Sequence, residues 1–181
     1  ILLVMEMNNM QNFINALQKN IVEKNWYSVL FTCLTLPDIC GKIDEPDAGS
    51  KARSVNWFNK YIQPIYTTRF NGDSEDHIFL HGEDFYALRC AYLHEGSDDI
   101  TTQRARKILN NFKFVVAPQG WVIHRNQVGQ TLQLQIDIFG EEIISGLETW
   151  LDDIQHDAIK KTKIDSMCNI EIIDLSRGFA I

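Results

Sequence analysis

The sequence lacks most of the features that identify secreted proteins and the common enzyme classes. Only four residues are cysteine (Cys33, Cys40, Cys90 and Cys168), and none forms a C-x-x-C pair. This spacing fits neither a zinc site nor a dense disulfide framework, so we expect small, mostly buried, reduced cysteines in a cytoplasmic protein. The motifs G-x-S-x-G, G-x-G-x-x-G and H-E-x-x-H are absent, as is a P-loop.

Long apolar runs and repeats are also missing. No stretch approaches the ~18–20 apolar residues of a membrane span, so we expect no membrane partner. The apolar start over residues 1–5 is too short for a signal peptide. No internal repeat or low-complexity segment is present. With 45% hydrophobic and 23% charged residues, the composition is that of a globular protein and excludes a collagen or a coiled-coil rod.

Positive charge is scarce as well. The chain has 17 basic against 24 acidic residues, which gives a formal net charge of −7. A general nucleic-acid coat protein needs net positive charge, so this class is disfavoured, although an acidic chain can still carry a local basic groove. The length of 181 residues corresponds to one domain, and we expect residues 1–181 to form one.

The first half of the chain is predicted to be helical. Apolar residues at spacings of three and four predict helices over 7–24, 26–36, 51–65 and 82–96. Pro37 and Gly41 are predicted to break or kink the second helix. Residues 97–111 are expected to form a loop, with a short helix near 103–109.

The second half changes period. Strands are predicted over 112–116, 121–126 and 131–137, the last two pairing as a hairpin through Val128 and Gly129. Helical spacing returns over 139–154, and a short strand is predicted over 170–173. The expected fold class is α+β: a helical bundle over about 7–111, followed over 112–181 by a small antiparallel sheet and a helix that packs back on the bundle.

One helix carries a pair of residues suited to phosphate chemistry. Gly82 opens this helix and Gly96 closes it as a C-terminal cap, with Arg89 and His94 five positions apart near its end. Five residues turn ~500° and rise ~7.5 Å, so the two side chains point about 140° apart. A loosened last turn, or two copies meeting across a dimer, could bring both groups to one phosphate.

This segment resembles the HEPN superfamily, whose members are helical bundles that include many metal-independent endoribonucleases. Their signature is an Arg followed four to six residues later by a His near a helix end, which Arg89 and His94 match. Cys90 follows Arg89 where active members often have Asn, Asp or His. The resemblance covers this motif and, loosely, the four predicted helices up to Gly96. It implies a homodimer with a composite site and RNA as the substrate.

The implied reaction is attack of a ribose 2′-OH on the adjacent phosphate. His94 would be the general base or acid, and Arg89 would stabilise charge on the phosphorane. In the alternative, Arg89 pairs with a nearby acid such as Glu83, Asp84 or Glu95, and His94 caps the helix. A third possibility is phosphate or nucleotide binding without turnover.

Other basic and histidine residues form weaker candidate sites. Arg104, Arg106 and Lys107 could form a phosphate track, or only a solvated face. His77 and His81 would suit a metal only on a helix, and we expect them in an extended segment, so we predict no metal and no cofactor. The alternative function is a non-catalytic helical interaction module of a bacterial defence or toxin–antitoxin system, with a cognate protein partner.

Overall fold

The computed structural model describes residues 9–170 of the chain. Within them it forms six α-helices, a short 3₁₀ helix and five short strands. These are α1 (Asn9–Val22), α2 (Trp26–Asp44), α3 (Ser50–Tyr61), η1 (Gln63–Tyr66), β1 (Thr67–Thr68), β2 (His77–Ile78), α4 (Gly82–Glu95), β3 (Asn111–Val115), β4 (Asn126–Val128), β5 (Thr131–Gln135), α5 (Ile136–Ile154) and α6 (Ala158–Asp165).

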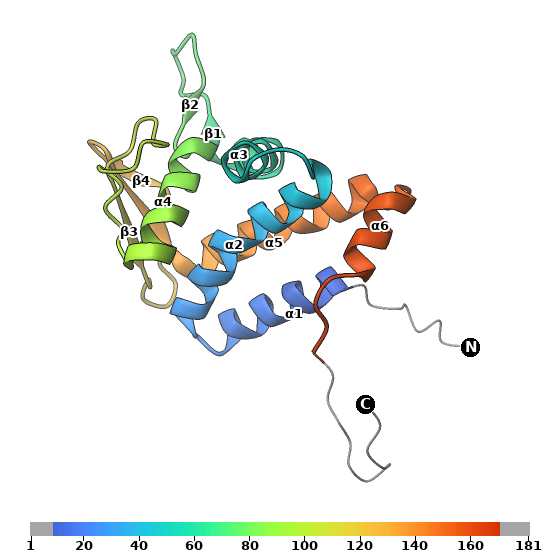
Figure 1. The fold of residues 1–181 in the computed structure, drawn as a ribbon. Helices are drawn as coiled ribbons and strands as arrows, with labels where there is room; N and C mark the ends of the chain where they lie inside the picture. Colours follow the sequence, from blue (N-terminus) through green and yellow to red (C-terminus); the bar gives the residue numbers. More distant parts are fainter. Residues whose placement is uncertain (1–8, 171–181) are drawn as a thin grey trace.

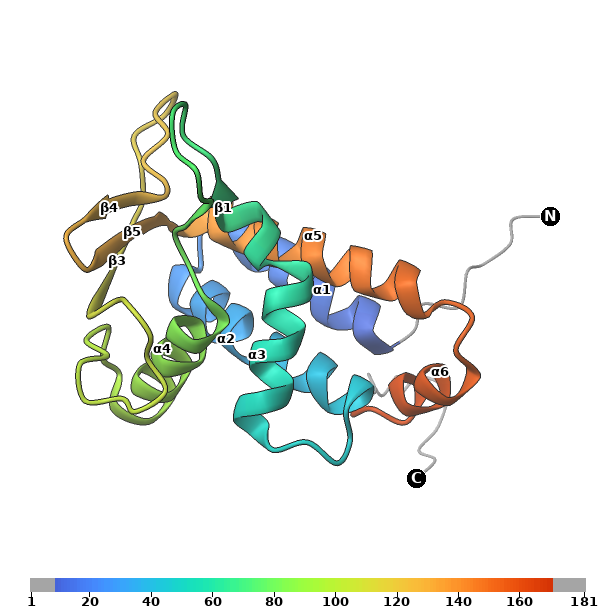
Figure 2. The same cartoon turned by 90° about the horizontal axis from the view of Figure 1, so that it is seen from above.

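The helices form a bundle with the three-stranded sheet at one end. Figures 1 and 2 show α1, α2 and α5 packed along one another, with α3 and α4 beside them. The sheet and α6 lie at opposite ends of this assembly, and the β1–β2 hairpin projects from it. The α+β class predicted from the sequence is therefore confirmed.

Helix α4 follows the sequence prediction closely. Glu83 and Asp84 occupy its first turn, where carboxylates favour the positive end of the helix dipole. Gly96 caps the other end in the left-handed conformation, with a φ of 66°, and its N–H bonds to the carbonyl groups of Ala91 and Tyr92. The motif residues Arg89 and His94 therefore lie on a helix with defined ends.

Helix α2 is longer than predicted. The sequence predicted a break or a kink at Pro37 and Gly41. The break does not occur, because the helix continues through both residues to Asp44. An internal proline costs about 3 kcal/mol of helix stability. Buried side chains follow it on the same helix (Cys40 and Ile43), and their packing outweighs that cost.

Helix α3 is shorter than predicted, and the expected short helix near 103–109 does not form. The chain leaves α3 after Tyr61 and enters η1, where Pro64 lies at the start of the 3₁₀ turn. Residues 101–110 form turns and bends instead of a helix.

The three-stranded sheet differs from the predicted antiparallel one. Its strand order is β3-β5-β4: β4 and β5 form the predicted antiparallel hairpin, but β3 runs parallel to β5. The strand expected over 121–126 begins only at Asn126. Leu132 and Leu134 of the central strand β5 are fully buried, as their alternation predicted. Most of the strand predicted over 170–173 lies outside the described residues.

Helix α5 packs the second half of the chain against the first. Trp150 is completely buried on its apolar face, and the indole N–H donates to Asp44 Oδ2 of α2 at 3.0 Å. A single core cluster contains side chains from α1 to α6 and from the three-stranded sheet. The prediction that this helix packs back on the bundle is confirmed.

None of the helices within residues 9–170 is long and apolar enough to cross a membrane.

Candidate functional site

Arg89 lies in a cluster of polar side chains contributed by three helices. Its Nη2 donates to Asp38 Oδ2 of α2 at 3.0 Å, and Arg53 Nε of α3 donates to Asp38 Oδ1 at 2.8 Å. The Ser50 hydroxyl also donates to Asp38 Oδ1, at 3.0 Å. The side chains of Asp38, Arg53 and Arg89 are only 13%, 19% and 18% exposed. The carboxylate of Asp38 thus joins α2, α3 and α4.

The backbone geometry at Gly41 brings these helices close enough for the cluster to form. A Cβ atom at this position would lie 2.5 Å from the carbonyl oxygen of Arg53, so only glycine permits this approach of α2 to α3. Gly41 is one helical turn after Asp38, and therefore lies on the same face. The glycine that was expected to break or kink the helix allows the close approach that places Asp38 against Arg53.

The cluster has an excess of positive charge. Two guanidinium groups share one carboxylate, and no other carboxylate in residues 9–170 lies within ion-pair distance of either. Arg89 Nε is buried without a hydrogen-bond partner in the described part of the chain. A carboxylate or phosphate anion would complement this positive charge.

His94 lies apart from this cluster, near the end of α4. Its side chain is exposed, whereas Arg89 points toward α2. Helix geometry separates the two directions by about 140°, so one chain does not direct both groups to one point. The ion-pair partner of Arg89 is Asp38, and none of the acids proposed from the sequence (Glu83, Asp84 and Glu95) takes that role.

The other predicted basic residues lie on the loop after α4. Arg104 is exposed, Arg106 donates to Asn110 Oδ1 at 2.8 Å, and Lys107 pairs with Glu83 at 3.7 Å. The buried carboxylate of Asp84 holds this loop in place by accepting the backbone N–H groups of residues 107–109 at 2.6–3.3 Å. The loop is thereby fixed to the start of α4.

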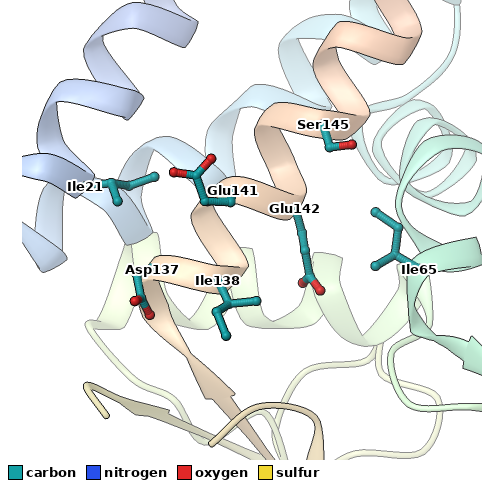
Figure 3. A pocket seen from close by; sticks show the side chains of 7 residues that line it. All are labelled: Ile21, Ile65, Asp137, Ile138, Glu141, Glu142 and Ser145. Carbon is teal, nitrogen blue, oxygen red and sulfur yellow. The ribbon is translucent and has the colours of Figure 1, made fainter. Parts of the chain in front are cut away.

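A second polar cluster lies beneath a surface pocket at the start of α5. This pocket has a volume of about 560 Å³ and is lined by three carboxylates, Ser145 and three isoleucines, as Figure 3 shows. Glu142, on its lining, accepts hydrogen bonds from the hydroxyl of Tyr66 and from Nε2 of His124. Burial and the neighbouring Glu142 raise the pKa of Tyr66.

The histidine in this cluster has a defined tautomer. Its Nδ1 accepts the backbone N–H of Gln135 at 3.1 Å, so the ring proton is assigned to Nε2, which donates to Glu142. Both oxygens of Glu142 lie within hydrogen-bond distance of Nε2. The network links η1, the segment before β4 and α5, and we assign it to stabilising the fold.

The remaining sequence candidates are well separated in the structure. His77 lies in β2, and His81 precedes α4 as its buried N-cap residue. They therefore do not share a helix. Cys33 and Cys40 are buried as expected, and burial raises the pKa of both thiols. Cys90 is half-buried and Cys168 is exposed, so the expectation of mostly buried cysteines holds for only two of the four.

Sequence reasoning missed Asp38, Arg53, His124 and Glu142. One signal for Asp38 was available, because a lone carboxylate among the apolar residues of 26–43 must be solvated or paired. Its partners lie 15 and 51 positions away, and no local pattern identifies them.

Comparisons with models of protein families, with curated proteins and with solved structures found no match for this chain. Any functional assignment therefore depends on the arrangement of the residues themselves.

Proposed function

We propose that the protein binds RNA and cleaves it without a metal, at a site built from Arg89 and His94 of two copies of the chain. The observation that carries this proposal is the positively charged cluster of Asp38, Arg53 and Arg89. Asp38 neutralises one guanidinium, which leaves about one positive charge at a partly buried position. A phosphate diester carries the complementary charge.

His94 would supply the proton transfer. A histidine imidazole can both take up and give back a proton, as general acid–base catalysis requires. The ribose 2′-oxygen forms a bond to the phosphorus while a histidine takes its proton. The bond from phosphorus to the 5′-oxygen breaks, and that oxygen receives a proton donated by His94 of the other copy. The products are a cyclic phosphate and a 5′-hydroxyl.

Two copies are required by the direction of the side chains. Arg89 and His94 diverge by about 140° on one helix. A two-fold axis near the ends of the two α4 helices would place His94 of one copy beside Arg89 of the other. Closed two-fold dimers are the commonest form of oligomer.

A second candidate function is a helical interaction module without catalysis. One observation favours it: Arg89 is largely buried and is engaged by Asp38 within its own chain. In that case the cluster would only hold α2, α3 and α4 together.

A cleavage assay separates the two functions. The full chain is incubated in EDTA with end-labelled structured and unstructured RNA, and the products are tested for cyclic phosphates. The mechanism uses only side chains, so EDTA should have no effect. His94→Ala should lower the rate by ~10²–10⁴-fold, the usual value of positioned acid–base catalysis. His156→Ala removes an exposed histidine from the α5–α6 connection and is the matched control.

Cys90→Asn provides a further comparison, since it restores a polar residue after Arg89 and should raise the rate. Absence of cleavage in both the unaltered protein and Cys90→Asn would contradict the nuclease proposal and favour the interaction module.

A further inference from the structure

An aromatic groove lies where the start of α2, the end of α4 and the edge of β3 meet. Its volume is about 430 Å³. The walls include Tyr27 and Leu30 of α2, Tyr92 of α4 and Phe114 of β3. Tyr27 is 77% exposed. Phe31 contacts Tyr92 edge to face, with ring centroids 5.2 Å apart, and supports that wall.

The β3 side of this groove has a free backbone edge. The N–H of Phe112 donates to the carbonyl of Asp98 at 3.0 Å, and the carbonyl of Asn110 accepts from Ile100 at 2.8 Å. Backbone groups alternate between the two edges of a strand with a period of two residues. The N–H and C=O of Phe114 therefore point to the same edge as the N–H of Phe112, away from β5. Within residues 9–170, no backbone group pairs with Phe114 there.

The chain itself leaves this edge uncovered. Residues 98–100 run along the first part of β3, and before them the chain turns into the left-handed cap of α4 at Gly96. A short strand could therefore continue alongside Phe114 and Val116. Exposed strand edges beside apolar pockets are recognised by extended peptides, whose main chain pairs with the edge and whose alternate side chains fill the pockets.

The charge around the groove distinguishes a peptide from a nucleic acid as its occupant. Asp98 lies on the lining of the groove, and the chain has a net charge of −7. A phosphate backbone is repelled there, whereas Lys or Arg is attracted. The free main-chain groups of Phe114 call for a strand, which a stacked nucleobase does not supply.

We propose that this groove binds an extended, basic peptide segment of a partner protein. The segment adds a strand to β3 beside Phe114, places a bulky apolar side chain between Tyr27 and Tyr92, and sets a Lys or Arg against Asp98. This binding does not depend on the proposed RNA cleavage, but it requires that Tyr92 and Gly96 at the end of α4 stay accessible.

The test is selection from a displayed library of random seven-residue peptides on the full chain. Counter-selection uses Tyr27→Ala/Val116→Pro, which removes a wall and a backbone donor. The enriched peptides should alternate apolar residues with Lys or Arg. A synthetic peptide of the enriched sequence should bind at least tenfold more weakly to Tyr27→Ala and to Asp98→Lys. It should bind unchanged to Trp121→Ala, which removes a different exposed aromatic residue, and to His94→Ala.

Three results would overturn the proposal. One is that no peptide is enriched on the full chain over the double variant. Another is that the enriched peptides are acidic, or bind Tyr27→Ala as well as they bind the unaltered chain. The third is that Tyr27→Ala abolishes binding of single-stranded RNA or self-association, because the groove then has a different occupant. Loss of RNA cleavage in His94→Ala with peptide binding intact would separate this proposal from the nuclease proposal.

Discussion

The carboxylate of Asp38 is shared by two arginines, so Asp38 contributes more to the stability of the fold than either arginine does. Loss of Arg89 leaves Asp38 paired with Arg53, so one ion pair survives. Loss of Asp38 leaves two guanidinium groups close together with no counter-charge. Removing one partner from a buried pair is more costly than the net contribution of the pair, because the remaining charge is uncompensated.

We therefore expect Asp38→Ala to destabilise the protein more than Arg89→Ala. Breaking a buried ion pair costs about 3–5 kcal/mol, and partial exposure of these side chains reduces this to roughly 2–4 kcal/mol for Asp38→Ala. Arg89→Ala should cost about half as much. Urea denaturation of the two variants and of Asp38→Ala/Arg89→Ala measures this. If Asp38→Ala and Arg89→Ala lower the free energy of unfolding equally, Arg53 does not share the carboxylate of Asp38.

His81 should make stability depend on pH in the mildly acidic range. Burial, reinforced by Lys107, lowers its pKa below the usual 6.5. The unfolded chain then binds a proton more readily than the folded one, so stability is fully present above pH 6.5 and is lost as the pH falls through the lower, folded-state pKa. We expect the urea midpoint to fall between pH 7 and pH 5, and to fall less in His81→Gln. Parallel pH profiles of the two proteins would contradict this role.

At the scale of elements, the close approach of α2 and α3 depends on Gly41, which has no side chain. Alanine at Gly41 would meet backbone atoms of Arg53, which cannot move aside as a flexible side chain can. The two helices must separate, and the Arg53–Asp38 pair on the same face is then lengthened.

Gly41→Ala is expected to destabilise by about 1–3 kcal/mol, the usual cost of overpacking. Thermal unfolding measures the loss. Gly49→Ala is the control, because no atom lies within 4 Å of the added Cβ. It lies at the N-cap of α3, where alanine costs at most roughly 1 kcal/mol. If both variants melt alike, Gly41 is not a contact point.

Local patterns explain which elements could be predicted. Spacing and capping residues identified α4 with its end at Gly96, and helical spacing identified α5 with buried Trp150. The parallel pairing of β3 with β5 was not predictable in this way, because Asn111 pairs with Thr131 and no turn residue encodes that register. The same holds for the site, since Arg89 was visible in the sequence but Asp38 lies 51 residues away.

At the scale of the whole molecule, the proposed nuclease site requires a homodimer. The interface should include the end of α4 from Arg89 to Gly96. Light scattering at micromolar concentration should give twice the mass of the 20.9 kDa chain. A monomer at that concentration would contradict the composite site, and the role of Arg89 would then be to stabilise the fold.

The anchoring of the 97–110 loop by Asp84 has a consequence for the dynamics of the molecule. Residues 107–109 have no regular secondary structure, yet their amide protons are held by a carboxylate buried at the base of α4. These amides should exchange with deuterated solvent as slowly as those of the core helices, whereas the amide of the exposed Thr102 on the same loop should exchange at once. Opening the loop would expose Asp84, so the loop and the first turn of α4 should open together as one cooperative unit.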